Sequence, residues 1–182
     1  TLTWTESGGD PSAGTLVMTG GSAKTMNFGD NSFKYFNLTV SGGALTVTNT
    51  PYIYGLLASS GANIIRSGDF GISGTTTPTV DSTTFANITQ FLYQAGAGNT
   101  TTVTATTYAA LRGSNSTPLL LGGATTATTV NLDSANVSLT TQGNNLTTKT
   151  IANNGTLTLS PGGGNGTTLT FTDLSGCGFG SS

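Results

Sequence analysis

The sequence predicts an all-β fold, and three observations lead to that prediction. Of the 182 residues, 99 are Gly, Thr, Ser or Asn, a composition typical of strands and turns. Apolar residues alternate with polar ones in many short segments, with the period of two that a strand requires. The strong helix formers Glu, Lys, Arg and Gln are scarce. These features argue against a helical bundle, a doubly wound α/β enzyme or a collagen.

The alternating segments predict strands along most of the chain, each bounded by Gly, Asn, Ser or Pro. In a strand of this kind one face is buried and the other, here rich in Thr, lies outside. The apolar residues that mark the segments are, in chain order, Leu2 with Trp4, Leu16 with Met18, Met26 with Phe28, Phe36 with Leu38 and Val40, Leu45 with Val47, Val130 with Leu132, Val137 with Leu139, Leu157 with Leu159, and Leu169 with Phe171.

Helical signals are weak. Residues 52–57 and 85–93 are the candidates, and the second contains Asn87, Ile88 and Thr89 without a helical apolar pattern, so it is interpreted as strand or irregular structure. Asp30 and Asp69 lie beside glycines and are interpreted as turn residues that hydrogen-bond their own backbone.

Two architectures fit strands that recur at this spacing. One is a β-solenoid, whose coils each contain two or three short strands joined at Gly and Asn corners. The other is an antiparallel β-sandwich. A degenerate internal repeat, over about 14–75 and 85–172, favours the solenoid and a single all-β domain over residues 1–182.

Three stretches carry a resemblance to a known group of proteins. They are Tyr-Phe-Asn-Leu-Thr-Val-Ser-Gly-Gly-Ala-Leu-Thr-Val at 35–47, Thr-Tyr-Ala-Ala-Leu at 107–111 and Gly-Thr-Leu-Thr-Leu at 155–159. They resemble the repeats of large bacterial surface proteins, such as adhesins and autotransporter-like passengers. The resemblance implies a right-handed parallel β-helix that serves as a stalk, adhesin or extracellular fibre. The alternative is a pilin-like sandwich with strand exchange.

The charge pattern excludes several partners. The net charge is −2, and no run of like charges exists that could bind nucleic acid or an anionic membrane surface. No apolar run is long enough to insert into a membrane. A chain that starts at Thr1 without Met, with Cys177 as its single cysteine, fits a mature secreted protein at the cell surface.

The sequence predicts no enzyme, no cofactor and no metal centre, although calcium stays open. It contains no histidine, so a Ser-His-Asp triad and an imidazole base are absent. The seven carboxylates are scattered, whereas a glycosidase needs two that face each other. A polysaccharide-active β-helix enzyme and a Thr-rich ice-binding protein are the less favoured alternatives.

Aromatic residues and Asn-x-Ser/Thr sequons are two further classes of residue that could bind or carry sugars at the surface. Most aromatic side chains are candidates for the core, and an exposed cluster of them could bind sugar rings. Eight Asn-x-Ser/Thr sequons are candidate glycosylation sites, namely Asn37, Asn87, Asn99, Asn115, Asn136, Asn145, Asn154 and Asn165. Asn37 is expected to face outward from its strand.

Uncharged strand edges point to a function. Soluble monomers protect such edges with charge or proline, because an open edge pairs with another strand. We therefore expect a secreted structural subunit that assembles head to tail with copies of itself into a filament, sheath or stalk. A surface adhesin or glycan-binding module is the alternative. The predicted assembly residues are Thr1, Leu2, Thr3, Trp4, Thr5, Leu169 and Phe171.

Overall fold

The computed structural model describes residues 2–3, 15–27, 34–35, 37–48, 52–53, 57–60, 64–72, 88–95, 98–160 and 167–171. Within these ranges the chain forms strands and no helix. The strands are β1 (Leu2–Thr3), β2 (Thr15–Met18), β3 (Lys24–Asn27), β4 (Lys34–Tyr35), β5 (Asn37–Ser41), β6 (Leu45–Val47), β7 (Tyr52–Ile53), β8 (Leu57–Ser60), β9 (Ile64–Ile72), β10 (Ile88–Tyr93), β11 (Thr101–Val103), β12 (Thr107–Gly113), β13 (Pro118–Leu121), β14 (Thr125–Leu132), β15 (Ser138–Thr140), β16 (Leu146–Asn153), β17 (Thr156–Thr158) and β18 (Leu169–Phe171).

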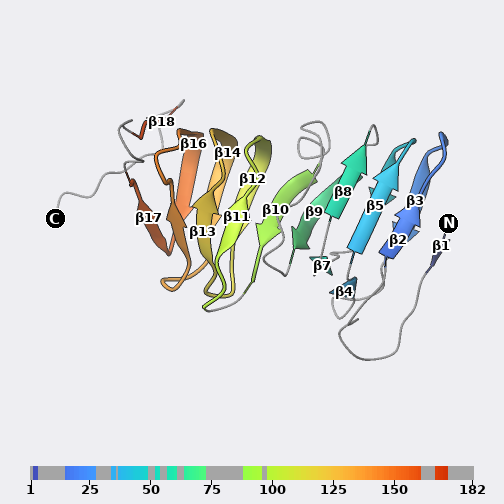
Figure 1. The fold of residues 1–182 in the computed structure, drawn as a ribbon, viewed down its shortest axis with the longest axis horizontal. Helices are drawn as coiled ribbons and strands as arrows, with labels where there is room; N and C mark the ends of the chain where they lie inside the picture. Colours follow the sequence, from blue (N-terminus) through green and yellow to red (C-terminus); the bar gives the residue numbers. More distant parts are fainter. Residues whose placement is uncertain are drawn as a thin grey trace.

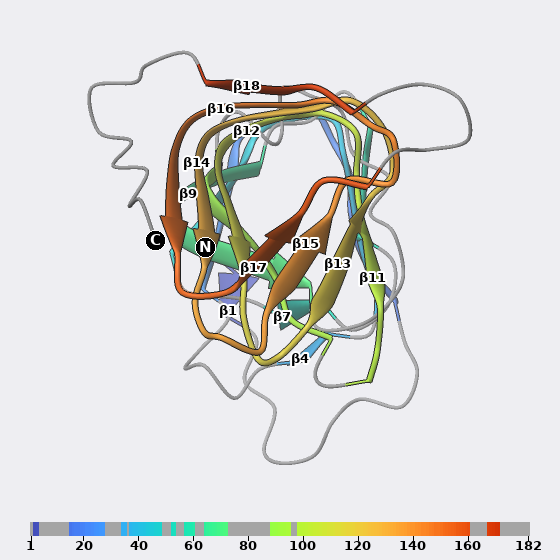
Figure 2. The same ribbon diagram turned by 90° about the vertical axis from the view of Figure 1, so that its left-hand side faces the viewer.

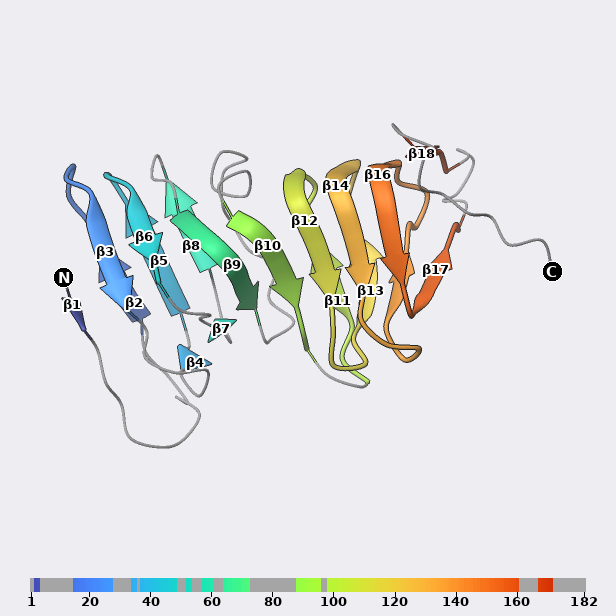
Figure 3. The ribbon, with the colours of Figure 1, turned by 180° about the vertical axis from the view of Figure 1, so that it is seen from behind.

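The strands form three sheets, and every pair of neighbours among them is parallel. The main path of the 11-stranded sheet runs β1-β3-β6-β9-β10-β12-β14-β16-β18, with β4 and β7 beside it. The two smaller sheets have the orders β2-β5-β8 and β11-β13-β15-β17. Figures 1 and 3 show the strands stacked along the long axis of the molecule.

This arrangement is a parallel β-solenoid, which confirms the predicted fold class. In most coils one strand of a small sheet comes first and one strand of the large sheet follows, as in β13 and β14. Residues in register lie one coil apart, at roughly 20 residues per coil: Leu111 pairs with Val130, and Val130 with Ile151. The antiparallel sandwich is wrong for the described strands. The right hand of the helix and the repeat over 14–75 and 85–172 stay predictions.

A corner in the later coils lies within the strands themselves. Along β14, Thr125 and Ala127 face the core, and after two outward residues Val130 and Leu132 face it again. This shift in the alternation marks a bend. Figure 2, which looks along the stack, shows β12, β14 and β16 curving there around the core. At the bend the hydroxyl groups of Thr129 and Thr150 are hydrogen-bonded at 3.1 Å.

The core is a set of apolar columns along the axis. Residues at the same position of successive coils stack because parallel strands pair in register. One such column contains Phe70, Phe91, Leu111 and Val130, all fully buried, and ends at the partly buried Ile151. The alternation predicted at Leu38 and Val40, at Leu45 and Val47, and at Val130 and Leu132 is confirmed, since all six side chains are buried.

The middle of the core holds a buried aromatic cluster. The ring centroid of Phe91 lies 6.1 Å from that of Phe70, 5.1 Å from Tyr93 and 6.0 Å from Tyr108. The two tyrosines and Thr104 close a hydrogen-bonded triangle. The Thr104 amide donates to the Tyr93 hydroxyl (3.2 Å), the two hydroxyls share a hydrogen bond (2.8 Å), and the Tyr108 hydroxyl donates to the Thr104 carbonyl (2.8 Å).

Burial changes the acidity of both phenols. Loss of hydration raises the pKa of Tyr93, although its hydrogen bonds to Tyr108 and Thr104 partly oppose that rise. The pKa of Tyr108 is raised well above its ordinary value, first by burial and then by the neighbouring Tyr93 phenol. Both groups therefore stay protonated in the folded chain at pH values where an exposed tyrosine ionises.

Several threonines depart from the outward positions that the sequence suggests. Five are buried, at Thr101, Thr117, Thr125, Thr141 and Thr148. Backbone carbonyls satisfy the hydroxyl groups: Thr117 donates to Ser114, and Thr148 donates to Thr150 at 2.9 Å. A buried hydroxyl is tolerated when it is hydrogen-bonded in this way.

Two local predictions, for Asp69 and Leu159, are changed by the structure, and one interpretation is confirmed. Asp69 is not a turn residue, because it lies within β9, paired with Gln90 of β10. Leu159 does not share the burial of a strand residue, because β17 ends at Thr158 and Leu159 is 47% exposed. The interpretation of 85–93 as strand or irregular structure is confirmed, because its described part contains β10, and the described part of the weak helical candidate at 52–57 contains β7 and the first residue of β8. Asp30 lies outside the described residues.

Three glycines at adjacent corners of the first coils allow a graded test. Gly42 has a φ of 92°, and a methyl group there would overlap the carbonyl of Gly20. Gly20 has a φ of 101° with open space around it, and Gly21 has neither constraint. We expect Gly42→Ala to lower the free energy of unfolding by about 3 kcal/mol, Gly20→Ala by about 1 kcal/mol, and Gly21→Ala by little.

Urea denaturation followed by circular dichroism measures this order. Gly20→Ala isolates the cost of the backbone angle, and Gly21→Ala controls for adding a methyl group at the same corner. Equal losses for Gly42→Ala and Gly20→Ala would show that the close approach of the two corners contributes nothing.

Candidate functional site

The candidate site consists of the two ends of the solenoid, which lie at opposite ends of the long axis (Figure 1). Strands β1 and β18 are the outermost strands of the large sheet, and β2 and β17 are the outermost strands of the small sheets at the two ends of the stack. Each therefore has one edge that pairs with no other described strand. Such an edge presents a row of backbone donors and acceptors to a further strand.

At the N-terminal end, β2 combines an open edge with apolar side chains. Met18 is buried and Leu16 packs against the core, whereas Val17 faces outward and is 57% exposed. Leu16 and Met18 are in register with Leu38 and Val40 of β5, so they continue two columns of the core to its end. The strand carries no charge.

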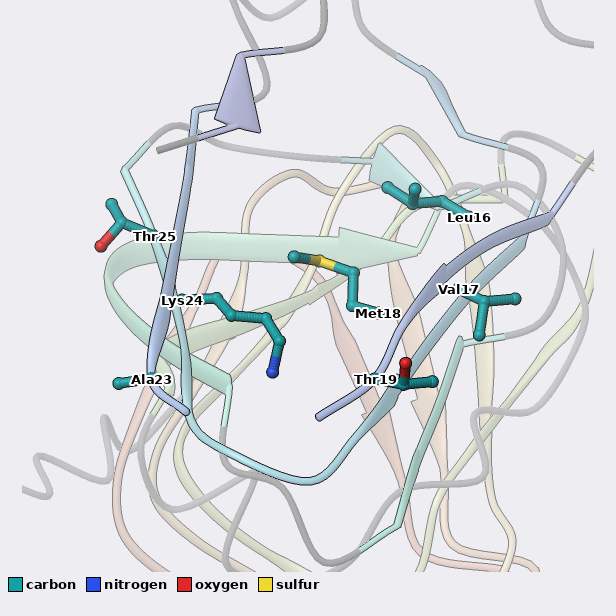
Figure 4. A pocket seen from close by; sticks show the side chains of 7 residues that line it. All are labelled: Leu16, Val17, Met18, Thr19, Ala23, Lys24 and Thr25. Carbon is teal, nitrogen blue, oxygen red and sulfur yellow. The ribbon is translucent and has the colours of Figure 1, made fainter. Parts of the chain in front are cut away.

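A pocket of about 550 Å³ lies beside this strand, between β2 and β3 (Figure 4). Its lining residues are Leu16, Val17, Met18, Thr19, Ala23, Lys24 and Thr25. The Lys24 ammonium group donates hydrogen bonds to the carbonyls of Gly20 (2.7 Å) and Ser22 (3.0 Å). The one charge in the lining is thereby held by the corner of its own coil.

At the C-terminal end, β17 and the residues after it present a second apolar surface. Leu157 and Leu169 are partly buried against the core, and Leu159 is 47% exposed. The backbone after Leu159 is anchored, because the Ser160 amide donates to the Thr141 hydroxyl at 3.0 Å. The Ser160 carbonyl accepts from the Thr167 hydroxyl at 2.7 Å. Leu159 is thus held at a defined position.

The structure places the predicted assembly segments at the two ends. Leu2 and Thr3 form β1, which pairs in register with Met26 and Asn27 of the same chain. Leu169 and Phe171 bound β18, which pairs with β16. Thr1, Trp4 and Thr5 lie outside the described residues. One edge of β1 is thus already paired within its own chain.

Sequence reasoning missed Val17 and Leu159 as exposed apolar residues at the ends. A signal for Val17 was present: three consecutive apolar residues cannot all face the core of a strand with period two. Leu159 differs from Leu157 because it lies past the end of β17, whereas Leu157 pairs with Leu139 of β15. No local sequence pattern identifies the last coil of a stack.

The described sequons lie on the surface to different degrees. Asn37 is half-buried on the outward side of β5, as predicted for its strand position. Asn99, Asn115, Asn136, Asn145 and Asn154 are exposed. Asn145 also accepts a hydrogen bond from the Thr168 amide at 3.1 Å. Asn87 and Asn165 lie outside the described residues, and glycosylation stays a prediction at all eight.

One group of polar side chains on the described surface contains an ion pair. The Arg112 guanidinium group donates to Asp133 at 2.8 Å and to the side-chain Oε1 of Gln90 at 3.4 Å. Both charged side chains are nearly a third exposed, so the pair adds little to stability. Among the described residues, no three His, Cys, Asp or Glu side chains form a group that could hold a metal ion.

Four aromatic residues have rings that contact one another, and all four are buried: Phe70, Phe91, Tyr93 and Tyr108. They belong to the core, as predicted for most aromatics of the chain. The predicted glycan-binding module, which would use exposed aromatics, stays a prediction.

Comparison of the chain with protein-family models, with curated proteins and with solved structures found no match. In the described part of the chain, no helix has the length and apolar character needed to cross a membrane.

Proposed function

We propose that the chain is an extracellular structural subunit that assembles end to end into a filament, sheath or stalk. The observation that carries the proposal is the pair of open, uncharged ends. Strands β1 and β2 at one end, and β17 and β18 at the other, contain no charged residue. A contact between two different surfaces repeats indefinitely in a head-to-tail stack, so it produces a polymer.

The parallel solenoid suits this role because its two ends continue the same pattern. Each internal coil pairs in parallel with the coil before it and the coil after it, so the free edges of the end strands offer a further subunit the same kind of contact. The low total charge, 12 charged residues among 182, is consistent with association rather than repulsion between copies.

Negative-stain electron microscopy of the purified chain tests the proposal. We expect filaments whose axial repeat is roughly 40 Å, since nine strands follow one another on the main path of the large sheet at ~4.8 Å each. The filaments should persist in high salt, because the end strands β1, β2, β17 and β18 carry no charge to be screened. A chain that stays monomeric at all concentrations in sedimentation experiments would refute the proposal.

A further inference from the structure

We propose that β17 of one copy adds in parallel beside β2 of the next copy, with Leu159 seated against Met18 in the pocket at the N-terminal end. The inference rests on the proposed end-to-end assembly and names the surfaces that form its contact. It assigns the pocket between β2 and β3 to one occupant, the segment Thr156–Leu159 of a second copy of this chain.

The columns of the core support this register. In one small sheet, Leu119, Leu139 and Leu157 form an inward column, and in the other, Leu16, Leu38 and Leu57 form one. Both columns end at a terminal strand of their sheet. Placing Leu157 opposite Leu16 joins them into a single column of leucines that crosses from one copy into the next.

That register also aligns the residues that follow. Thr158 then lies opposite Val17, and Leu159 lies opposite Met18. Val17 and Leu159 are the two large hydrophobic side chains that are exposed in the described part of the chain. The contact brings both of them to the junction, one from each end: Leu159 becomes covered in line with Met18, and Val17 becomes covered on the flank that faces Thr158.

The charges near the junction do not oppose the contact. Lys24 is the charged residue in the pocket lining, and its ammonium group is already bonded to the Gly20 and Ser22 carbonyls. Its methylene chain can therefore cover apolar surface while the charge stays at the corner. The arriving segment, Thr-Leu-Thr-Leu, carries no charge that would lose hydration.

Disulfide trapping between copies tests the register. The variant Val17→Cys/Thr158→Cys is made in a Cys177→Ser background, which removes the natural thiol. Adjacent parallel strands lie ~4.8 Å apart, within the range of Cα separations that a disulfide can bridge. We expect mild oxidation to produce a ladder of covalent multimers on a non-reducing gel. Within one copy the two positions lie at opposite ends of the molecule (Figure 3), so a bond must join two copies.

The matched control is Thr39→Cys/Thr158→Cys in the same background. Thr39 lies in β5 and pairs with Val17 of the neighbouring strand β2. In the proposed contact its Cα therefore lies two strand spacings from that of Thr158, at roughly 9–10 Å. That distance is too long for a disulfide, so no ladder is expected. A ladder of equal strength from the control would overturn the register, because the disulfides would then form in random encounters between copies and not in the proposed contact.

Microscopy of the same samples separates the two proposals. Filaments without a ladder from Val17→Cys/Thr158→Cys would overturn this interface and leave end-to-end assembly standing. The absence of both would overturn both. A second variant uses no disulfide: Leu159→Glu should abolish filaments, whereas Thr126→Glu, at an exposed position on the side of the stack, should leave them intact. Filaments formed by Leu159→Glu would also contradict the seating of Leu159.

Discussion

Replacement of Phe91 by alanine is expected to lower the free energy of unfolding by about 3–5 kcal/mol. Phe91 is fully buried, and its ring packs against Phe70, Tyr93 and Tyr108 at centroid distances of 5.1 to 6.1 Å. Its column continues through Leu111 in the next coil. Truncation removes apolar contacts on both sides and leaves a cavity that rigid neighbouring coils cannot close.

Urea denaturation followed by far-ultraviolet circular dichroism measures this loss. Phe91→Leu is the matched control, because it keeps most of the apolar volume and should cost less than about 2 kcal/mol. Thr126→Ala, at an exposed position of β14, should change the free energy of unfolding by less than about 0.5 kcal/mol. A loss below about 1 kcal/mol for Phe91→Ala would show that the aromatic cluster is not the centre of the core.

Alkaline pH is expected to destabilise the fold steeply. Burial raises the pKa of Tyr93 and, more strongly, that of Tyr108 above the value of an exposed phenol. The unfolded chain then releases protons that the folded chain retains. The stabilisation is fully present below pH 10, and it is lost as the pH rises from 10 through the folded pKa values. The two phenols together can contribute a slope of up to about 2.7 kcal/mol per pH unit.

The double variant Tyr93→Phe/Tyr108→Phe tests the origin of this slope. It removes both buried phenols together, so no hydroxyl of the pair is left without its partner. We expect its free energy of unfolding to depend much less on pH above 10, as measured by urea denaturation at a series of pH values. A slope unchanged from that of the natural chain would assign the effect to other groups.

The single variant Tyr108→Phe separates the hydrogen bonds from the titration. At neutral pH it leaves the Thr104 carbonyl without the bond from the Tyr108 hydroxyl, and Tyr93 without its hydroxyl partner. Losing these buried bonds should cost about 1–3 kcal/mol at neutral pH. Because phenylalanine keeps the ring, a loss near zero would show that the triangle contributes through packing alone.

The all-β class and the strand faces follow from local patterns. The alternation at Leu38 and Val40, and again at Val130 and Leu132, requires only that one face of a strand be buried. The parallel pairing does not follow from it, because an antiparallel sandwich needs the same period of two. The register of Leu111 with Val130, and of Val130 with Ile151, distinguishes the two folds.

The candidate site was predictable in part. Uncharged segments at both ends of the chain indicated open strand edges, and the structure places β1 and β18 at the two edges of the large sheet. The apolar residues Val17 and Leu159, and the pocket at Met18, were not predicted. Their exposure depends on which coil lies next to them, and composition carries no information about that neighbour.

The sequence by itself determined the strand composition, the scarcity of charge and the alternation of inward and outward residues. Each of these depends on residue type and on positions a few residues apart. The tertiary structure decided which coil lies beside which, and so which apolar residues form a continuous core and which remain at its ends. The physical reason is that pairing between coils joins residues about one coil apart, where local propensity no longer acts. The same reason accounts for the buried hydroxyl groups of Thr125 and Thr148, whose environment depends on the coils around them.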